Sequence, residues 1–285
     1  MKAEDFTNHG VFALKRFYHT SSLKDIEEAI FDFEQALEHT PHGNPRKATR
    51  LSNLASALNS RFERLGELDD IHRSIASLTE AISITPEKQP EFPHLLSNLG
   101  NSYGLRYKRT AVLEDLDRSI LNHLQAVNCT PPPLATWLTN LGTAYLYRFL
   151  RSGDLTDVNQ AISCHRRSII STSGSSEDLP GFYNNIGYSY FCRYEHTADL
   201  DDLDVSILNH EKSIALTPAG HADLFTWFGN LGKSYSRRGA RSGKVVDINR
   251  TIDNHQKALD LIPRRHAQLP MVLNNLGCMA VRLHI

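Results

Sequence analysis

Apolar residues recur along most of this chain at the three- and four-residue spacing of one face of an α-helix. One such stripe is formed by Leu51, Leu54, Ala55, Leu58 and Phe62. A second is formed by Leu116, Ile120, His123 and Val127. The sequence has no sustained alternation of apolar and polar residues, the pattern that would indicate a β-strand. The pattern therefore predicts an all-α protein.

The helical stripes repeat with a fixed period. Residues 98–107 read Asn-Leu-Gly-x-x-Tyr-x-x-Arg-Tyr, and the Asn of this motif returns at spacings of 45, 45, 42, 45, 45 and 45 residues. The seven positions are Asn8, Asn53, Asn98, Asn140, Asn185, Asn230 and Asn275. Such a period is typical of stacked structural repeats, in which each unit buries its apolar face against its neighbours. The predicted units are approximately 1–48, 49–93, 94–135, 136–180, 181–225 and 226–270, with a partial unit at 271–285.

Each unit is predicted to contain two helices. The first ends near a glycine such as Gly66, Gly153 or Gly243, since glycine favours helix C-termini. The second begins around an aspartate such as Asp115, where a carboxylate stabilises the first helical turn. It ends at Thr-Pro, because proline cannot continue a helix. The 42-residue spacing reflects a three-residue deletion in the Pro131–Pro133 connection, where chain length can change without shifting a helix.

Two polar columns flank the break between the paired helices. An arginine follows the Asn by eight positions and an aspartate by seventeen in all six complete units, as in Arg106 and Asp115. A carboxylate in the first turn of the second helix can also accept two hydrogen bonds from one guanidinium group. We interpret the pair as a structural link that fixes the connection between the helices. A row of phosphate-binding arginines is the alternative.

A histidine column invites a metal-site hypothesis, with His123, His165, His210 and His255 at equivalent positions. Equivalent residues of stacked repeats lie about one helix pair apart, roughly 10 Å or more. A shared zinc ion needs every nitrogen within about 2.1 Å. Because Phe33 and Leu78 occupy this column in the first two units, we assign it to packing. Two positions after each Asn, a small residue such as Gly100 would let the two helices approach closely.

These columns resemble the tetratricopeptide repeat. Its signature of Leu-Gly-x-x-Tyr is matched by Leu99, Gly100 and Tyr103, while Ala126 and Pro131 match its second half. The units here are longer than the usual 34 residues. They resemble repeat arrays of large fungal proteins, which often adjoin a caspase-like (CHAT) protease domain or a nucleotide-binding domain. The resemblance implies an all-α, right-handed solenoid of helix-turn-helix repeats that binds a peptide or protein in its concave groove.

The resemblance also implies which residues would contact a partner. The Asn just before Leu-Gly often bonds the backbone of an extended peptide, and an amide offers the donor and acceptor that this requires. The candidate contact residues are Asn53, Asn98, Asn140, Asn185, Asn230 and Asn275, with Asn101, Tyr188, Lys233 and Arg237 projecting the same way. The alternative is that each Asn bridges adjacent helices inside the stack.

Composition narrows the functional classes. The formal charge is −1 over 285 residues, which gives no general attraction to nucleic acid or membrane. From residue 233 onward the net charge is +7, so RNA binding by the basic C-terminal third is a weaker alternative. The four cysteines lie far apart, which argues against a disulfide framework and favours a reducing compartment. We predict a cytoplasmic location, with the nucleus left open. The chain has no membrane-length apolar run and no signal-peptide core.

The sequence has no nucleophile elbow, phosphate-binding loop or paired metal-ligand motif. We therefore expect no catalytic residue, no cofactor and no metal ion. The final stretch after Asn275 stays apolar, unlike the polar face of a capping repeat, and this predicts a fragment of a longer product or self-association through the last helix. The leading functional hypothesis is a protein-interaction scaffold. The alternative is a sensor array that regulates an attached protease-like or nucleotide-binding domain. The sequence identifies neither the partner nor the process served.

Overall fold

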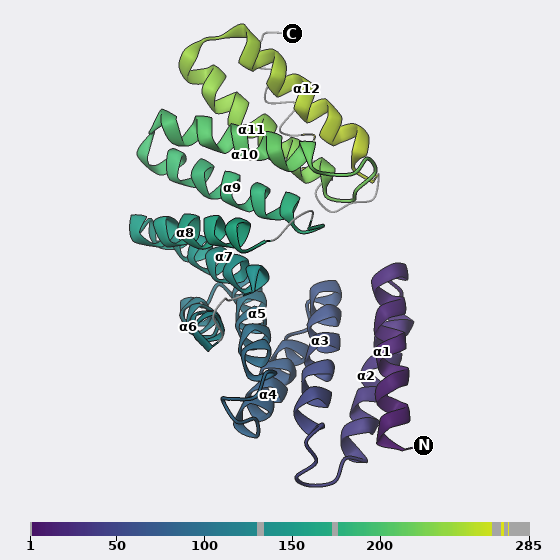
Figure 1. Ribbon diagram of the computed structural model, residues 1–285. Coiled ribbons are helices and arrows are strands. Elements are labelled where there is room, and N and C mark those ends of the chain that lie inside the picture. Colours follow the sequence, from purple (N-terminus) through teal and green to yellow (C-terminus); the bar gives the residue numbers. More distant parts are fainter. Residues whose placement is uncertain (1, 130–133, 173–175, 264–268, 271–272, 274–285) are drawn as a thin grey trace. The chain divides into compact units, whose positions relative to one another are not determined.

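The computed structural model describes residues 2–129, 134–172, 176–263, 269–270 and 273. This part of the chain forms twelve α-helices and contains no strand, which confirms the all-α prediction (Figure 1). The six helix pairs, in chain order, are α1 (Ala3–Thr20) with α2 (Leu23–Glu38), α3 (Lys47–Leu65) with α4 (Leu68–Ser83), α5 (Phe92–Thr110) with α6 (Leu113–Cys129), α7 (Ala135–Ser152) with α8 (Leu155–Ser171), α9 (Leu179–Thr197) with α10 (Leu200–Ala215), and α11 (Leu224–Ser242) with α12 (Val245–Leu261).

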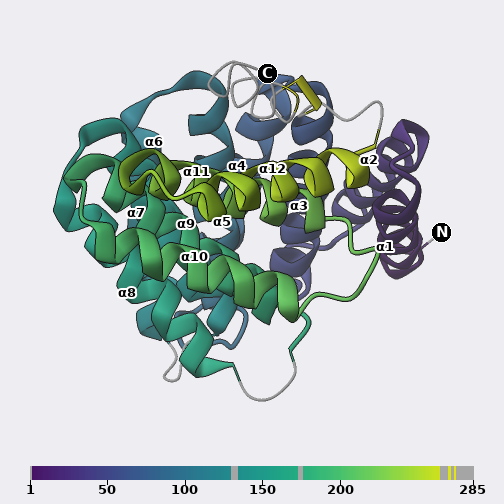
Figure 2. The same ribbon diagram turned by 90° about the horizontal axis from the view of Figure 1, so that it is seen from above.

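The chain forms two compact units, Met1–Ala144 and Tyr145–Ile285. In the first, each helix from α1 to α6 packs against the next one in the chain. In the second, α8 to α12 pack in the same successive manner, and Figure 2 shows α9 to α12 from above. First helices also contact one another, α1 with α3 and α3 with α5 in one unit, and α9 with α11 in the other. This arrangement is the helix-turn-helix solenoid that the repeat predicts.

The first helices end in a left-handed residue at one fixed position of the repeat. Gly66, Gly153 and Gly243 hold it in three pairs with φ of 75°, 75° and 66°, as predicted. In the other three pairs the position is occupied by Ser21, Ala111 and Ala198, with φ of 55°, 58° and 59°. A side chain with a Cβ atom is strained in this region by roughly 1–2 kcal/mol. The repeat geometry therefore requires the left-handed turn even where the sequence does not supply glycine.

The second helices begin two residues earlier than the aspartate column. α4 starts at Leu68 and α6 at Leu113, so Asp70 and Asp115 lie within the first turn. The C-terminal ends of the second helices agree with the Thr-Pro signal. In the three described Thr-Pro sequences the threonine hydroxyl donates to the carbonyl four residues back, which closes the last turn. These threonines are Thr40, Thr85 and Thr217, at 2.5, 2.7 and 2.6 Å. Thr130 and Pro131 lie outside the described residues.

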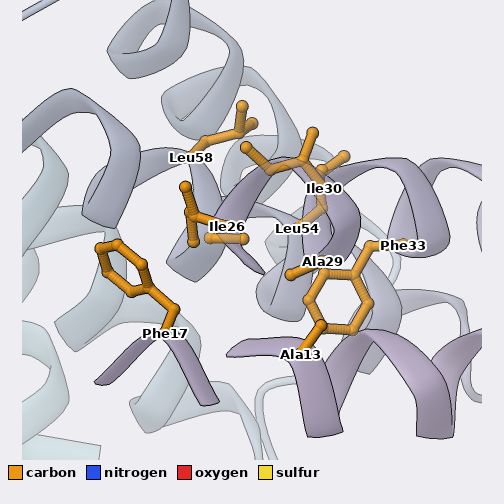
Figure 3. Packing of buried hydrophobic residues seen from close by; sticks show 9 residues of the cluster. Ala13, Phe17, Ile26, Ala29, Ile30, Phe33, Leu54 and Leu58 are labelled. Atoms are coloured by element: carbon orange, nitrogen blue, oxygen red, sulfur yellow. The ribbon is translucent and has the colours of Figure 1, made fainter. Parts of the chain in front are cut away.

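The core is built from the apolar stripes of successive helices. In the first unit one cluster joins Ala13 of α1, Ile26 and Phe33 of α2, and Leu54 and Leu58 of α3 (Figure 3). Phe33, Ile26 and Leu58 are fully buried. Because a single cluster draws on three helices, neither helix of a pair buries its apolar face without the next pair.

No helix in the described part of the chain combines the length and the apolar character that a membrane crossing needs. The predicted partial unit at 271–285, including Asn275, lies outside the described residues except for Leu273.

Candidate functional site

An arginine–aspartate ion pair closes each of the six helix pairs. In the third pair Arg106 Nε and Nη2 donate to the two carboxylate oxygens of Asp115 at 2.9 and 2.6 Å. The same two-bond geometry joins Arg61 to Asp70, Arg148 to Asp157, Arg193 to Asp202 and Arg238 to Asp247. The first pair differs, because Arg16 divides its nitrogens between Asp25 and Glu28. The predicted structural link is confirmed in geometry.

The setting of these ion pairs explains their structural character. Each aspartate is buried, and Asp115 is only 2% exposed. The guanidinium carbons of Arg106, Arg193 and Arg238 also lie 5.2–5.4 Å from the ring centre of a tyrosine three residues earlier in the same helix. A guanidinium group that holds a buried carboxylate and covers an aromatic ring has a structural role that accounts for its presence. The arginine column therefore belongs to the architecture.

The glycine column makes room for the histidine column. A Cβ atom added to Gly100 would lie 2.8 Å from the His123 ring, and one added to Gly232 would lie 2.7 Å from the His255 ring. Gly10 stands in the same relation to Phe33, at 2.8 Å. These distances are shorter than real Cβ contacts allow, so the first helix needs glycine wherever the second carries a ring. The packing interpretation of the histidines is confirmed.

Burial controls the chemistry of these histidines. It lowers the pKa of His123 to about 4, and the pKa of His210 to about 3 with a smaller contribution from Lys233. It also lowers the pKa of His255 to about 4, again with a contribution from Lys233. Ring nitrogens of all three histidines are buried without a hydrogen-bond partner. The imidazoles are therefore neutral in the folded protein at pH 7.

The asparagine row lies on the first helices. Asn53, Asn98 and Asn140 are half-buried in one unit, as are Asn185 and Asn230 in the other. Asn98 Nδ2 donates to Ser52 Oγ of the preceding first helix at 3.2 Å. Asn230 Nδ2 donates to Asn184 Oδ1 of the preceding first helix at 3.1 Å. These two asparagines thus bridge neighbouring helices, as the alternative interpretation expected, while part of each side chain stays accessible. Their contact with a partner remains a prediction.

The four neighbouring candidates have different surroundings. Asn101 is exposed on α5. Tyr188 is half-buried, and its ring stacks on Phe191 with centres 6.3 Å apart. Arg237 donates two hydrogen bonds to Glu195 of α9, at 2.8 and 3.0 Å. Lys233 is half-buried, and burial lowers its pKa. In the described part of the chain no carboxylate forms an ion pair with Lys233, which sets it apart from Arg237.

A serine and asparagine network near the asparagine row was not predicted. Asn59 Nδ2 donates to Ser102 Oγ at 3.0 Å, and Ser102 Oγ lies 3.0 Å from Ser74 Oγ. Ser206 and Ser234 form the equivalent contact in the second unit, also at 3.0 Å. The 28-residue separation of each serine pair was the available signal in the sequence. These contacts satisfy buried hydroxyl groups between adjacent helix pairs.

One group of described residues could supply three ligands to a metal ion. His9 of α1 and Glu28 and Asp32 of α2 each offer a ligand atom, and the three atoms lie within 4.8 Å of one another. The repeat pattern of the sequence did not indicate this group, because its members belong to three different columns.

The basic C-terminal third is partly neutralised within the protein. Arg238 Nη1 donates to Asp204 at 2.7 Å in addition to its bonds with Asp247. Arg250 donates to the hydroxyl of Tyr235 at 2.6 Å and lies 4.0 Å from Glu211. With Arg237 paired to Glu195, three of the arginines in this segment have partners on the protein itself.

Comparison with known proteins identifies the fold. No family model and no curated protein matches the sequence. Among solved structures, the chain is similar to PilW, a type IV pilus biogenesis factor, with a TM-score of 0.63 and 14% identity over 95% of this chain and 98% of that one. It is also similar to a chain of the APC/C hetero-tetramer Cut9–Hcn1, with a TM-score of 0.66 and 14% identity.

The Cut9–Hcn1 match covers 98% of this chain but only 42% of that one, so the present chain spans less than half of that relative's length. A third match is TTC0263, a thermophilic TPR protein of Thermus thermophilus, with a TM-score of 0.52 and 17% identity over 76% and 92% of the two chains. The protein therefore has the tetratricopeptide-repeat fold.

Proposed function

We propose that this protein is a scaffold that binds an extended protein segment along its first helices. The observation that carries the proposal is the row of half-buried amides, Asn53, Asn98 and Asn140 in one unit and Asn185 and Asn230 in the other. The first helices α3 and α5 contact one another, as do α9 and α11, so Asn53 and Asn98, and likewise Asn185 and Asn230, lie on adjoining helices. An extended peptide presents a donor and an acceptor at every residue, and an amide can satisfy both.

The inter-helix hydrogen bonds support the proposal by holding the amides in place. Asn98 uses one Nδ2 hydrogen on Ser52, and Asn230 uses one on Asn184. Each amide has a second Nδ2 hydrogen and an oxygen with two lone pairs. A side chain fixed by one hydrogen bond loses less rotamer entropy when it binds a ligand.

Lys233 gives the proposed surface a charge preference. Lys233 has no carboxylate partner among the described residues, and burial of an ammonium group without such a partner is costly because its desolvation is not offset. A carboxylate on the bound segment would offset that cost. We therefore expect the second unit to prefer segments that carry an acidic side chain or a free C-terminus near Lys233.

A protein ligand is favoured over RNA because Arg237, Arg238 and Arg250 already bond groups within the protein. We assign no catalytic step to the chain. The cytoplasm stays the expected location because Cys129, Cys164 and Cys192 are free thiols.

Affinity capture followed by peptide-array mapping of the captured proteins tests this function. The wild-type chain is compared with a variant that carries Asn185→Ala, Asn230→Ala and Lys233→Ala, and with an Arg167→Ala variant on the exposed face of α8. We expect the triple variant to lose captured proteins that the wild type and Arg167→Ala retain, with an unchanged far-ultraviolet circular dichroism spectrum. Equal capture by all three chains would refute the proposed surface. Loss of helical signal in the triple variant would show that the amides serve folding instead.

A further inference from the structure

The geometry points to a divalent metal site of the zinc class on the first helix pair, formed by His9, Glu28 and Asp32. His9 Nδ1 lies 2.8 Å from Asp32 Oδ2 and 3.8 Å from Glu28 Oε1. A tetrahedral zinc ion with bonds of about 2.0–2.1 Å places its ligand atoms about 3.4 Å apart. These two separations bracket that value, and the ligand atoms of Glu28 and Asp32 lie within 4.8 Å of each other, so side-chain rotations can bring all three atoms to one ion.

The residue types depart from the repeat at all three positions. The column one residue after each Asn holds leucine or isoleucine in the other five described pairs, and only the first pair has histidine there. The columns 20 and 24 residues after Asn hold carboxylates only at Glu28 and Asp32. In the other pairs the first of these columns holds Leu54, Leu99, Leu141, Ile186 and Leu231. The second holds Arg73, Arg118, Gln160, Val205 and Arg250, and the third holds Ser77, Asn122, Cys164, Asn209 and Asn254.

The repeat architecture alone explains a single polar residue on the surface that these three columns form. It does not explain a histidine together with two carboxylates. In the sixth pair the equivalent residues Leu231, Arg250 and Asn254 line a cavity of about 400 Å³ against α10 of the preceding pair. On the first pair the same surface needs only to be polar if solvent covers it. A lysine or serine would serve that purpose. An imidazole and two carboxylates that converge instead supply the nitrogen and oxygen ligand types that bind zinc, and three protein ligands would leave the fourth position of a tetrahedral ion open.

The surrounding residues hold the ligands in a suitable state. Asp32 is buried, with 6% of its side chain exposed, while His9 is 58% exposed and gives an ion a path from solvent. Arg16 Nη2 donates to Glu28 Oε2 at 2.5 Å and leaves Oε1 facing His9. Arg16 also bonds Asp25 at 2.6 Å, so it acts as a positioning residue for Glu28.

Zinc titration by isothermal calorimetry tests this inference in a buffer that does not chelate metal. The variants His9→Leu and Asp32→Asn copy residues that other repeats carry in the same columns, so both should fold. His221→Leu is the matched control, because His221 lies 3.9 Å from Asp223 without a third ligand among the described residues. We expect one zinc ion per wild-type chain, retention of that binding in His221→Leu, and its loss in His9→Leu and Asp32→Asn. Arg16→Gln should weaken it by about tenfold.

A second measurement does not depend on variants. Diethyl pyrocarbonate modifies accessible imidazoles, and zinc should protect His9 but leave His221 reactive when both sites are read by mass spectrometry. Absence of stoichiometric zinc binding to the wild type would overturn the inference. Equal zinc binding by wild type and Asp32→Asn, or zinc protection of His221 as strong as that of His9, would overturn it as well.

Discussion

Acid should destabilise this protein through its buried histidines, and His123 offers the clearest test. Its ordinary pKa of 6.5 falls to about 4 in the folded chain, and burial is the sole cause. The unfolded chain therefore binds a proton at a pH where the folded chain does not. The stability gained from the neutral imidazole is fully present above pH 6.5 and is lost as the pH falls toward 4.

The magnitude follows from the two pKa values. One pH unit of difference corresponds to about 1.4 kcal/mol, so His123 accounts for about 2 kcal/mol between pH 7 and pH 5 and about 3 kcal/mol in all. His210 and His255 should act in the same direction, and Lys233 disfavours their protonation further. Three such groups amount to about 6 kcal/mol at pH 5, which is comparable to the whole stability of many domains.

The assay compares wild type with His123→Phe by urea unfolding at pH 7, 6 and 5. The first helix pair already places Phe33 against Gly10, so a phenyl ring should fit against Gly100. The variant should lose about 2 kcal/mol less than wild type between pH 7 and pH 5. A control at an exposed position without a titratable side chain, Asn101→Ala, should behave as wild type. Equal pH dependence of wild type and His123→Phe, or a His123 NMR titration midpoint near 6.5, would refute the reasoning.

Three further predictions concern the repeat framework. Gly100→Ala should lower the free energy of unfolding by about 1–3 kcal/mol through contact with the His123 ring. Adding His123→Leu recreates the Ala–Leu pair of the second repeat and should recover most of this loss, as measured in a double-mutant cycle by urea unfolding. Ala111→Gly should stabilise the chain by about 0.5–1 kcal/mol, since it relieves a left-handed alanine; an unchanged or lower urea midpoint would count against it. Asp115→Ala should lower the free energy of unfolding by about 3 kcal/mol and lower the melting temperature, because it leaves Arg106 without its buried partner. The helical signal should be retained. Unchanged stability would show that the ion pair is not a structural link.

The sequence predicted the features that recur with the same residue types, and it did not predict features that no residue type signals. The period located all six helix pairs, the Arg106–Asp115 link and the packing role of His123, because each feature recurs and is read by comparing columns. The left-handed Ala111 was missed, since only glycine signals that conformation in a sequence. His9, Glu28 and Asp32 were missed because their relation appears only when two helices are placed side by side.

The role of the asparagine row also could not be predicted from the sequence alone. The sequence correctly placed Asn98 and Asn230 on equivalent helices, but it could not decide between an outward and an inward role. In the structure each amide donates to the preceding first helix and remains partly accessible, so the inward bond leaves room for an outward contact on the same side chain. Whether an amide meets a neighbouring helix depends on the separation of two repeats, and no local pattern encodes that separation.

The ion pairs have a consequence for how such a chain can change during evolution. In each case the arginine and the aspartate are nine residues apart and belong to one helix pair. A gene segment of one repeat that is duplicated or lost therefore carries both charges with it, and neither partner is left unmatched in the remainder. Repeat number can thus vary in whole units without stranding a buried carboxylate, whereas a break placed between arginine and aspartate would be selected against.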